Sequence, residues 1–410
     1  MLRFAQLPAR YRLWRPEHLR LVGRDLLGAR PAPVAEHREH LEAVIGWLVR
    51  AQDRRDGQPD AGGVSAGWSF EDGWLPSYPE TSGYIVETFI AAARILDRPE
   101  LIDRAGRILD WELSIQNSDG AYPGHFGEAG SKPVIFNTGQ IMHGMVAGYT
   151  ALGREDCLES AVRAAHWMLA QQDSDGCWRR SVHNDIPHTY NTRSAWALLR
   201  TGFLADEPRF VQAAQRNLNW ALAQATPSGW FRQNAFRTGE TPFTHTIAYA
   251  MRGFLEVGVA TGEVRLVEAS AAAARALAKA QREDGWLAGE FDDGWQSSAR
   301  YSCLTGVAQV ALIWQRLRQE GVDGDWQPYI DRALRFLKGQ HRRLGSAGPD
   351  DGAIAGSLPF WGRYSRFEYP NWAAKFFADA LMMEIVDEPV PAVGAGRAQV
   401  QAQPAEASNA

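Results

Sequence analysis

Apolar residues recur at helical spacing along most of the chain, and the segments that carry them are of two kinds. In residues 36–51, Leu41, Val44 and Leu48 lie three or four positions apart, as on one face of a helix. The segment 82–96, SGYIVETFIAAARIL, is instead apolar almost all round. A one-sided pattern predicts a helix with one face in solvent, whereas an all-round apolar pattern predicts a buried helix.

The two kinds of segment alternate along the chain until six pairs have formed. Further one-sided helices are expected at about 100–115, 157–171, 207–223, 264–280 and 326–339, and further apolar helices at about 138–151, 192–203, 244–258, 300–316 and 370–386. Such pairs bury a continuous core only by stacking side by side. Six pairs therefore predict an all-α fold, a closed (α/α)6 barrel with an inner and an outer ring of helices.

A repeated sequence unit marks the end of each outer helix. Its clearest copy is WMLAQQDSDGCW at Trp167–Trp178, in which a helix end is followed by Gln, an acidic turn, Gly and an aromatic residue. Related copies are WELSIQNSDGAY at 111–122, WALAQATPSGW at 220–230 and ALAKAQREDGW at 276–286, and weaker copies begin at Leu48 and Phe336. Recurrence at a spacing of roughly 50–60 residues indicates a repeat architecture.

The connections between the predicted helices differ in length according to their direction. Connections from an inner to an outer helix are short, such as LDRPE at 96–100 and LGRED at 152–156. Connections from an outer to an inner helix are long and span 53–80, 117–137, 173–191, 225–243, 287–299 and 341–369. Alternation brings every long connection to one end of the barrel. Because long loops in compact domains are usually functional, we expect the active face there.

The predicted inner helices begin with polar and aromatic residues at this same end. Helix capping explains residues such as Thr138 and Thr192. Capping does not explain ten others, which are Glu80, Gln140, His143, His188, Tyr190, Arg193, His245, Tyr301, Glu368 and Tyr369. Their convergence on the central cavity predicts a polar site at the mouth of the barrel.

The densest group of these residues suits proton abstraction from a uronic acid. His188 or Tyr190 would remove the C5 proton, and Asn191 and Arg193 would neutralise the adjacent carboxylate. This is the equipment of a polysaccharide lyase or a C5 epimerase. His245 and Tyr301 begin the next two inner helices, and we expect them to complete the catalytic set.

Hydrolysis is the alternative chemistry, and it uses two carboxyl groups. Glu80 and Glu368 begin the first and sixth inner helices, which are neighbours in a closed ring. A carboxylic acid and a carboxylate flanking a glycosidic bond are the groups that glycosidases need. The competing interpretation is that each carboxylate only interacts with its helix dipole.

Substrate binding is expected from further residues of the long-loop end. Asn137, Gln140 and Tyr369 are predicted to contact the substrate, together with Asn191 and Arg193. The chain has 16 tryptophans, many in predicted loops, where a flat ring can stack on a sugar face. The candidate stacking residues are Trp74, Trp178, Trp230, Trp286 and Trp295. For each of them, closing the end of a helix is the alternative role.

The net charge and the cysteine content argue against nucleic-acid binding, a disulfide framework and a structural zinc site. A formal net charge of -5 argues against a general nucleic-acid role, which calls for a basic face. Three widely spaced cysteines, Cys157, Cys177 and Cys303, predict neither a disulfide framework nor a structural zinc site. No cofactor and no metal are expected, and a metal role for Asp292 and Asp293 is only a minor alternative.

The two ends of the chain are expected to lie outside the toroid proper, which we place at residues 36–386. Residues 1–35 form an Arg-rich arm that lacks the apolar stretch of a secretory signal, and no segment is apolar enough to span a membrane. A cytoplasmic location is therefore expected. The arm is predicted to pack across the barrel, with peripheral contact to an anionic membrane as the alternative. Residues 387–410 lack apolar periodicity and are predicted to be a disordered tail.

The repeat unit at Trp167–Trp178 and, approximately, at Trp220–Trp230 resembles the QW-type repeats of the terpenoid cyclase and protein prenyltransferase toroids. The six-hairpin architecture equally resembles glycosidases, unsaturated uronyl hydrolases, polysaccharide lyases and sugar epimerases. The cyclase resemblance implies an Asp-x-Asp-Asp or Asp-Asp-x-x-Asp motif, and the sequence contains neither. The prenyltransferase resemblance implies a zinc site, but no Asp stands two residues before Cys303.

The polar residues at the mouth favour the carbohydrate branch of this resemblance. The expected function is an enzyme acting on an acidic, uronate-containing oligo- or polysaccharide, by lyase or epimerase chemistry or by hydrolysis, in polysaccharide biosynthesis. Two other functions stay open at this point. One is a terpenoid-cyclase or prenyltransferase-like enzyme, and the other is a non-catalytic glycan-binding scaffold.

Overall fold

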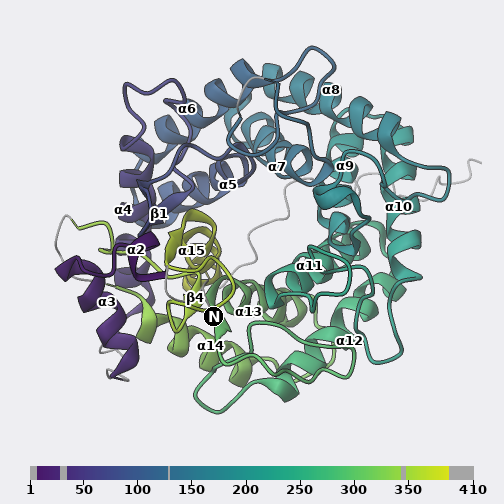
Figure 1. Ribbon diagram of the computed structural model, residues 1–410. Coiled ribbons are helices and arrows are strands. Elements are labelled where there is room, and N and C mark those ends of the chain that lie inside the picture. The colour runs from purple at the N-terminus through teal and green to yellow at the C-terminus, as the bar shows by residue number, and fades with distance from the viewer. Residues whose placement is uncertain (1–6, 28–34, 128–129, 343–347, 387–410) are drawn as a thin grey trace, which may run out of the picture.

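Two concentric rings of helices form the protein, seen along the barrel axis in the computed structural model (Figure 1), which describes residues 7–27, 35–127, 130–342 and 348–386. The outer ring consists of α4 (His37–Asp53), α6 (Glu100–Ile115), α8 (Glu155–Gln171), α10 (Pro208–Leu222), α12 (Val264–Ala280) and α14 (Gln327–Gln340). The inner ring consists of α5 (Pro79–Leu96), α7 (Ile135–Leu152), α9 (Thr192–Leu204), α11 (Thr244–Thr261), α13 (Leu304–Gln319) and α15 (Asn371–Ile385). Helix α15 packs against both α4 and α5, so the ring is closed. The predicted (α/α)6 barrel is confirmed.

Burial follows the two sequence patterns. Every residue of α7 from Ile135 to Gly148 is buried, whereas α10 buries only the face that carries residues such as Phe210, Leu218 and Ala221. Each long connection joins the C-terminus of an outer helix to the N-terminus of an inner helix; the first spans 54–78 and the last spans 341–370. They therefore lie at one end of the barrel, which we call the mouth.

The repeat unit fastens each helix pair to the next. In the four clear copies the turn glycine has a positive φ, between 80° and 92°, and leaves no room for a Cβ because the next outer helix approaches it closely. The contacts are Gly120 with Arg163, Gly176 with Arg216, Gly229 with Ala272 and Gly285 with Arg332. In the copy that begins at Leu48, the glycine of the repeat was expected at Gly57, which has open space around it, and Gly62 makes the contact instead, with Arg107. In the copy that begins at Phe336, Gly345 lies outside the described residues, and Gly352 makes the contact with Ala43. The last contact returns to α4 and closes the ring at the level of the turns.

The repeated glutamine makes the matching polar link. Gln172 Nε2 donates to the carbonyl of Gly176 in its own turn at 3.1 Å and to that of Ala213 on the next outer helix at 2.9 Å. Gln116 makes the equivalent bonds to Gly120 and Ser160. The repeated glutamine thus ties the carbonyl of its own turn to a carbonyl of the next outer helix.

We expect Gln172→Ala to lower the free energy of unfolding by about 1–3 kcal/mol, because two carbonyls lose their donor. Urea titration would measure the change. Gln224→Ala is the matched control, since Gln224 Nε2 bonds only the Trp220 carbonyl of its own helix, at 3.3 Å. Equal effects of the two substitutions would contradict the fastening role.

Short strands within the long loops are the main feature that the sequence pattern did not predict. Strands β1 (Gly67–Ser69), β2 (Gly73–Trp74) and β5 (Glu368–Pro370) form a small antiparallel sheet, with Trp68 opposite both Trp74 and Tyr369. Strand β3 (Ser302–Cys303) pairs with β4 (Ser357–Leu358). Because Ser302 and Cys303 are extended in this pair, α13 begins at Leu304 rather than near residue 300.

The N-terminal arm packs against these loops through α2 (Leu7–Arg10), α3 (Pro16–Leu26) and the turn between them. The His18 ring lies 4.1 Å from that of Phe70, and the Tyr11 ring lies 4.4 Å from that of Phe367. Arg20 also pairs with Asp350 at 2.9 Å. Among the described helices none is long and apolar enough to cross a membrane. The predicted tail at 387–410 lies outside the described residues.

A buried carboxyl group in the outer ring gives a second stability prediction. Glu112 on α6 is fully buried, and neither of its oxygens has a hydrogen-bond partner among the described residues. Burial raises the pKa of Glu112 well above its ordinary value of 4.5. Because the folded form holds the proton more tightly than the unfolded form, this stabilising contribution is complete below pH 4.5 and is lost as the pH rises.

Glu112→Gln should therefore raise the free energy of unfolding at pH 8 by about 1–3 kcal/mol, with a smaller gain at pH 5. The amide keeps the shape of the protonated acid and cannot ionise. Denaturant titrations at the two pH values would measure the difference. The exposed Glu155, changed to Gln, serves as the control, and a Glu112→Gln gain that does not depend on pH would count against a neutral Glu112.

Candidate functional site

A cavity of about 320 Å³ lies at the mouth, where the inner helices begin, and we call it the mouth cavity. Its wall is mainly aromatic and consists of Tyr78, Phe136, Tyr190, Phe236, Phe243, Tyr249, Tyr364 and Trp372. Its polar lining consists of Glu80, Asn137, His183, His245, Arg363 and Ser365. An apolar wall with a few polar groups is typical of small-ligand sites.

Glu80 is the one carboxylate among the described residues that line the mouth cavity. It is the second residue of α5, directly after Pro79, and its Oε2 accepts a hydrogen bond from the Tyr78 hydroxyl at 3.0 Å. Burial raises the pKa of Glu80 to about 7, although the Tyr78 hydroxyl and the charge of Arg193 act in the opposite direction. Such a carboxyl group can give and take a proton near neutral pH.

His245 contributes a neutral imidazole to the same cavity. Its Nδ1 lies 2.8 Å from Oε1 of Gln309 on α13. An amide oxygen only accepts, so this contact assigns the proton to Nδ1 and leaves Nε2 as an acceptor. Burial lowers the pKa of His245 to about 3, which keeps the ring neutral at ordinary pH. His245 can therefore orient a hydroxyl group or a water molecule.

Tyr190 and His188, two predicted proton movers, form one stack with ring centroids 4.4 Å apart. Only Tyr190 lines the mouth cavity, where His183 also appears without having been singled out in the sequence. His188 is buried, and its Nε2 lies 2.7 Å from the His183 carbonyl. Burial lowers the pKa of His188 to about 4 and raises that of Tyr190 well above 10, so neither group is a strong base near pH 7.

Arg193 lies below the mouth cavity, beneath a floor formed by the rings of Tyr84, Tyr249 and Phe376. The guanidinium of Arg193 lies 5.4 Å from the Tyr249 ring and 6.0 Å from the Tyr84 ring, and its Nε donates to Gln140 Oε1 at 2.7 Å. Gln140 thus positions Arg193. Asn191, one of the predicted carboxylate-binding residues, is buried in the turn before α9, and the described lining of the mouth cavity does not include it.

Three other predicted residues lie away from the described lining of the mouth cavity. Tyr301 packs against Phe243 and Tyr364 and has its ring directly over Gly289. Tyr369 packs on Trp68 and Phe360. Glu368 lies on β5, where burial and then the nearby Glu71 and Asp72 raise its pKa to about 7. The structure therefore does not bring Glu368 into the mouth cavity as the partner of Glu80.

The five predicted stacking tryptophans hold loops and helix ends together. Trp178 is only 1% exposed and donates to the Met168 carbonyl at 3.0 Å, so its assignment as a stacking platform is wrong. Trp230 and Trp295 donate to the carbonyls of Phe291 and Ser228, Trp74 packs on Trp47, and Trp286 lies under Arg282. Within the described lining, the tryptophan of the mouth cavity is Trp372, which donates to the Tyr364 hydroxyl at 2.8 Å.

The acidic turn at Asp292 and Asp293 has a structural explanation as well. Asp292 Oδ1 accepts hydrogen bonds from the backbone nitrogens of Gly294 and Gln296, at 3.0 and 2.7 Å. It therefore shapes its own turn. In the described part of the chain no three His, Cys, Asp or Glu side chains are grouped so that they could hold a metal ion.

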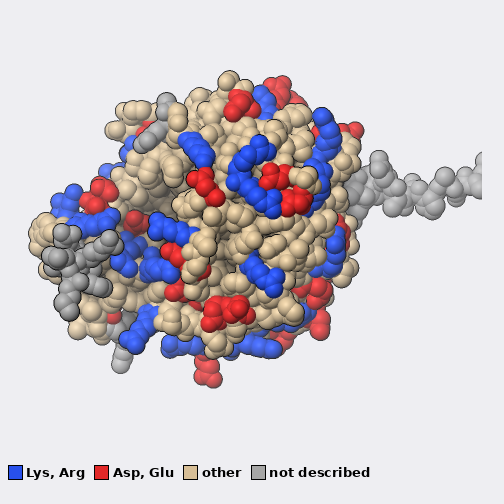
Figure 2. Space-filling model, turned by 45° about the vertical axis from the view of Figure 1, so that its right-hand side comes forward, with Lys and Arg blue, Asp and Glu red and all other residues tan. Residues whose placement is uncertain are grey.

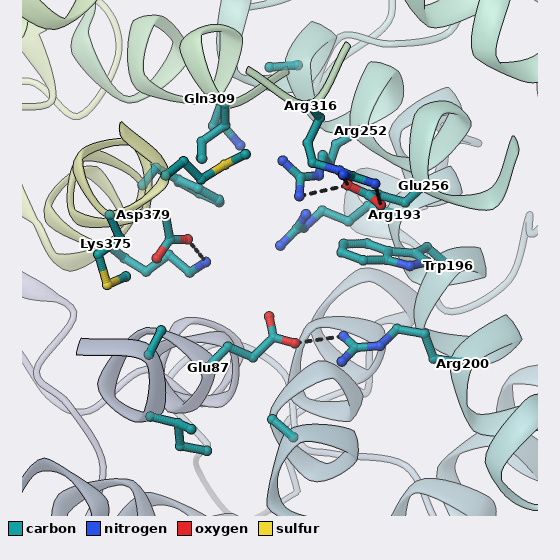
Figure 3. A pocket seen from close by; sticks show the side chains of 18 of the residues that line it. Glu87, Arg193, Trp196, Arg200, Arg252, Glu256, Gln309, Arg316, Lys375 and Asp379 are labelled. Atoms are coloured by element: carbon teal, nitrogen blue, oxygen red, sulfur yellow. Dashed lines mark hydrogen bonds and ion pairs between the residues drawn. The ribbon is translucent and has the colours of Figure 1, made fainter. Parts of the chain in front are cut away.

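A second cavity of about 260 Å³ lies inside the inner ring, below the floor, and we call it the lumen cavity. The inner helices were expected to be apolar almost all round, and this expectation is wrong for the faces that point to the barrel axis. Figure 3 shows charged side chains from α5, α9, α11, α13 and α15 that point into the lumen: Glu87, Arg193, Arg200, Arg252, Glu256, Arg316, Lys375 and Asp379. The spacing Arg252/Glu256 and Lys375/Asp379, four residues apart, was a sequence signal for such pairs.

Basic and acidic side chains are interspersed on the outer surface shown in Figure 2. Many of them pair locally, such as Arg179 with Asp175 at 2.7 Å and Arg154 with Asp110 at 2.5 Å. Exposed pairs of this kind contribute little to stability. The charges inside the lumen are of a different kind because they are buried.

Comparisons with known proteins support the fold from two sides. The family model of the squalene-hopene cyclase C-terminal domain matches residues 76–265. No curated protein sequence matches the chain. The chain is an (α/α)6 toroid, and its structural neighbours are six-hairpin carbohydrate enzymes.

Three solved structures illustrate this similarity. An unsaturated glucuronyl hydrolase specific for heparin has 16% identity and a TM-score of 0.66, covering 85% of this chain and 96% of that chain. The unsaturated glucuronyl hydrolase of Bacillus sp. GL1, responsible for glycosaminoglycan degradation, has 14% identity and a TM-score of 0.65, with 84% and 96% covered. The corresponding enzyme of Streptococcus agalactiae has 14% identity and a TM-score of 0.64, with 89% and 95% covered.

Proposed function

We propose that the mouth cavity binds a sugar of an acidic, uronate-containing glycan and that the protein hydrolyses the glycosidic bond with Glu80 as general acid. The observation that carries this proposal is Glu80 itself, a carboxyl group of pKa about 7 in an aromatic cavity. The resemblance to unsaturated glucuronyl hydrolases supports the choice of substrate class.

Each part of the cavity has a role in this proposal. Aromatic rings such as Trp372 and Tyr190 offer apolar faces on which a sugar ring can stack. Asn137 and Nε2 of His245 offer hydrogen bonds to sugar hydroxyls. Arg363 brings positive charge to the rim, where it also pairs with Glu240 and Glu290. Glu80 donates its proton to the leaving oxygen as the bond to the anomeric carbon breaks, water adds to that carbon, and the proton that the added water gives up returns Glu80 to its acid form. In this proposal Glu80 acts without a second carboxylate in the described lining.

We favour hydrolysis over lyase or epimerase chemistry because the described lining of the mouth cavity lacks a strong base near pH 7. Removal of a C5 proton needs a base that is deprotonated and strong at the working pH. The raised pKa of Tyr190 and the lowered pKa of His188 make both residues poor bases near pH 7. Glu80 has a suitable pKa for either role, so the direction of its proton transfer separates the two chemistries.

The test is incubation of the purified protein with saturated and unsaturated uronate-containing oligosaccharides. New reducing ends without an unsaturated product would support hydrolysis. An unsaturated product with ultraviolet absorbance would instead identify a lyase, and solvent deuterium at C5 without cleavage would identify an epimerase. Binding without turnover of any glycan would contradict an enzyme and favour a glycan-binding scaffold.

A terpenoid-cyclase-like enzyme is the second candidate, supported by the family model that covers residues 76–265 and by the aromatic wall of the mouth cavity. Aromatic faces can stabilise carbocations by cation–π interaction. The polar groups Glu80, Asn137 and His245 in the same cavity favour a polar substrate. Cyclic products from squalene or a polyprenyl diphosphate, analysed by mass spectrometry, would decide for this candidate.

A further inference from the structure

The lumen cavity has two unlike walls, and neither is used by the proposed reaction at the mouth. Helices α9, α11 and α13 supply a cationic wall of Arg193, Arg200, Arg252 and Arg316. Helices α5, α7 and α15 supply the apolar side chains of the opposite wall, Ile90, Ala91, Ala147, Ala151, Met382 and Met383, beside the charged Glu87, Arg94, Lys375 and Asp379.

Positive charge exceeds negative charge in the lumen. Six basic side chains line it, against the three carboxylates of Glu87, Glu256 and Asp379. Glu256 is shared, because it pairs with Arg252 at 2.7 Å and with Arg316 at 3.1 Å. Glu320, outside the lining, is a further partner of Arg316 at 2.7 Å. An excess of positive charge remains even when Glu320 is included.

Arg193 is the buried cation in which this excess is concentrated. Within the described part of the chain, no carboxylate forms an ion pair with Arg193, and its Nε bonds only the neutral Gln140 oxygen, at 2.7 Å. Glu87 is already taken by Arg200 at 2.7 Å, and Asp379 is bonded by Lys375. A buried charge without a counterion is costly, and a bound anion would relieve that cost.

Neutral side chains hold the guanidinium groups in place. The Trp196 ring lies 5.3 Å from the guanidinium carbon of Arg200, 5.5 Å from that of Arg193 and 5.7 Å from that of Arg252 (Figure 3). His143 joins two of these arginines, because its Nδ1 contacts Arg200 Nη1 at 2.8 Å and its Nε2 contacts the Arg193 carbonyl at 3.2 Å. Burial, followed by Arg193 and Arg200, lowers the pKa of His143 well below its ordinary value, so the ring is neutral. The arginines are thus ordered without loss of charge.

The lumen cavity opens at the end opposite the mouth. Its lining reaches the last turns of α5 and α7, where Arg94 and Ala151 are exposed. At the other end the rings of Tyr84, Tyr249 and Phe376 form the floor that separates the lumen from the mouth cavity, with Tyr84 and Phe376 at 5.5 Å and Tyr249 and Phe376 at 5.9 Å. A ligand could enter from the far end without passing the mouth.

We propose that the lumen is a second binding site, for an amphiphilic oxyanion, a carboxylate or phosphate monoester that carries a short apolar chain. The oxyanion contacts Arg193 and its neighbours on the cationic wall, since guanidinium groups match carboxylate and phosphate geometry. The apolar chain lies along Ala91, Met382 and Met383. This site does not depend on the reaction proposed for the mouth.

Titration calorimetry on the full chain with monomeric octyl phosphate and octanoate would test this proposal, with octyl glucoside and inorganic phosphate as comparison ligands. One equivalent of an octyl oxyanion should bind, and the oxyanion that binds more tightly identifies the headgroup. Octyl glucoside lacks the charge and inorganic phosphate lacks the chain, so both should bind at least about tenfold more weakly. Equal binding of either comparison ligand, or no binding of both oxyanions, would overturn the proposal.

Two variants test whether the octyl oxyanion binds in the lumen cavity. Arg193→Gln should weaken octyl phosphate about 10–100-fold, because one charged donor is lost. Ala91→Trp should block the apolar wall by volume without changing any charge, so the test remains decisive if Arg193→Gln does not fold. Tyr190→Phe, which keeps the ring and changes no charge in the mouth cavity, should leave the affinity unchanged. Wild-type affinity in both lumen variants would show that the anion binds elsewhere.

Discussion

Glu80→Gln is expected to lower kcat/KM on the cleaved glycan by about 10²–10⁴-fold, the loss that follows removal of a general acid. The substitution keeps the size of the side chain and can still accept a hydrogen bond from the Tyr78 hydroxyl. It removes only the exchangeable acidic proton. The measurement is a comparison of steady-state rates on an oligosaccharide that the wild-type protein cleaves.

Glu368→Gln is the matched control for this substitution. Glu368 has the same raised pKa of about 7 as Glu80, but the described lining of the mouth cavity does not include it. We expect its rate to stay within about threefold of wild type, by the usual criterion that a group must reach the reacting atoms to transfer a proton. A loss as large as that of Glu80→Gln would restore the two-carboxylate mechanism suggested by the sequence.

The pH dependence of kcat/KM gives the direction of proton transfer. A general acid must be protonated, so activity should be constant below pH about 7 and should fall tenfold for each pH unit above it. An activity that instead rises through pH 7 would make Glu80 a base and favour lyase or epimerase chemistry. Because Glu80→Gln cannot titrate, its residual activity should lack this step.

The sequence predicted the barrel well because the barrel depends on periodic features. Apolar spacing located the twelve helices of the two rings, and the Gln and Gly of the unit at Trp167–Trp178 mark the contacts between neighbouring repeats. The error at the start of α13 arose from a long-range strand pair, Ser302 with Leu358, which local spacing does not encode.

The part of the mouth cavity that the helix starts form was predicted from the sequence, whereas the part that the long loops form was not. Helix starts correctly brought Glu80, Asn137, Tyr190 and His245 to one cavity. The position of Tyr364 depends on how the long loop before α15 folds, and so does the placement of Glu368 on a strand. Trp372 is the second residue of α15, and the sequence analysis did not single it out. The assignment of Trp178 to stacking failed because a repeated aromatic residue was serving the repeat itself.

The charged lumen was not predicted from the sequence because its charged residues are few in each inner helix and stand among apolar ones. In α11, Arg252 and Glu256 stand among residues that are otherwise apolar, so the helix still has the character of a buried segment. Their spacing of four places both on one face, which the closed ring turns toward its axis. The ion pairs in the lumen are therefore a consequence of ring closure, and they make the inner ring sensitive to single charge changes.

Glu256→Gln should lower the free energy of unfolding by about 3–5 kcal/mol, the cost of breaking a buried ion pair by removing one partner. Glu256 is 2% exposed and holds both Arg252 and Arg316. Burial alone would raise its pKa, but the two arginines lower it, so the carboxylate is charged and both guanidinium groups depend on it. Urea titration, with the slope checked for two-state behaviour, would measure the loss.

Two further variants separate this buried network from an ordinary surface pair. Glu320→Gln removes a partly exposed partner of Arg316 and should cost only about 0–1 kcal/mol. The triple variant Arg252→Met, Glu256→Leu, Arg316→Met should recover most of the stability lost in Glu256→Gln, since apolar residues of similar volume often replace a buried ion network without cost. If Glu256→Gln and Glu320→Gln had equal, small effects, water in the lumen would have to be solvating the arginines, and the buried carboxylate would not be what stabilises the inner ring.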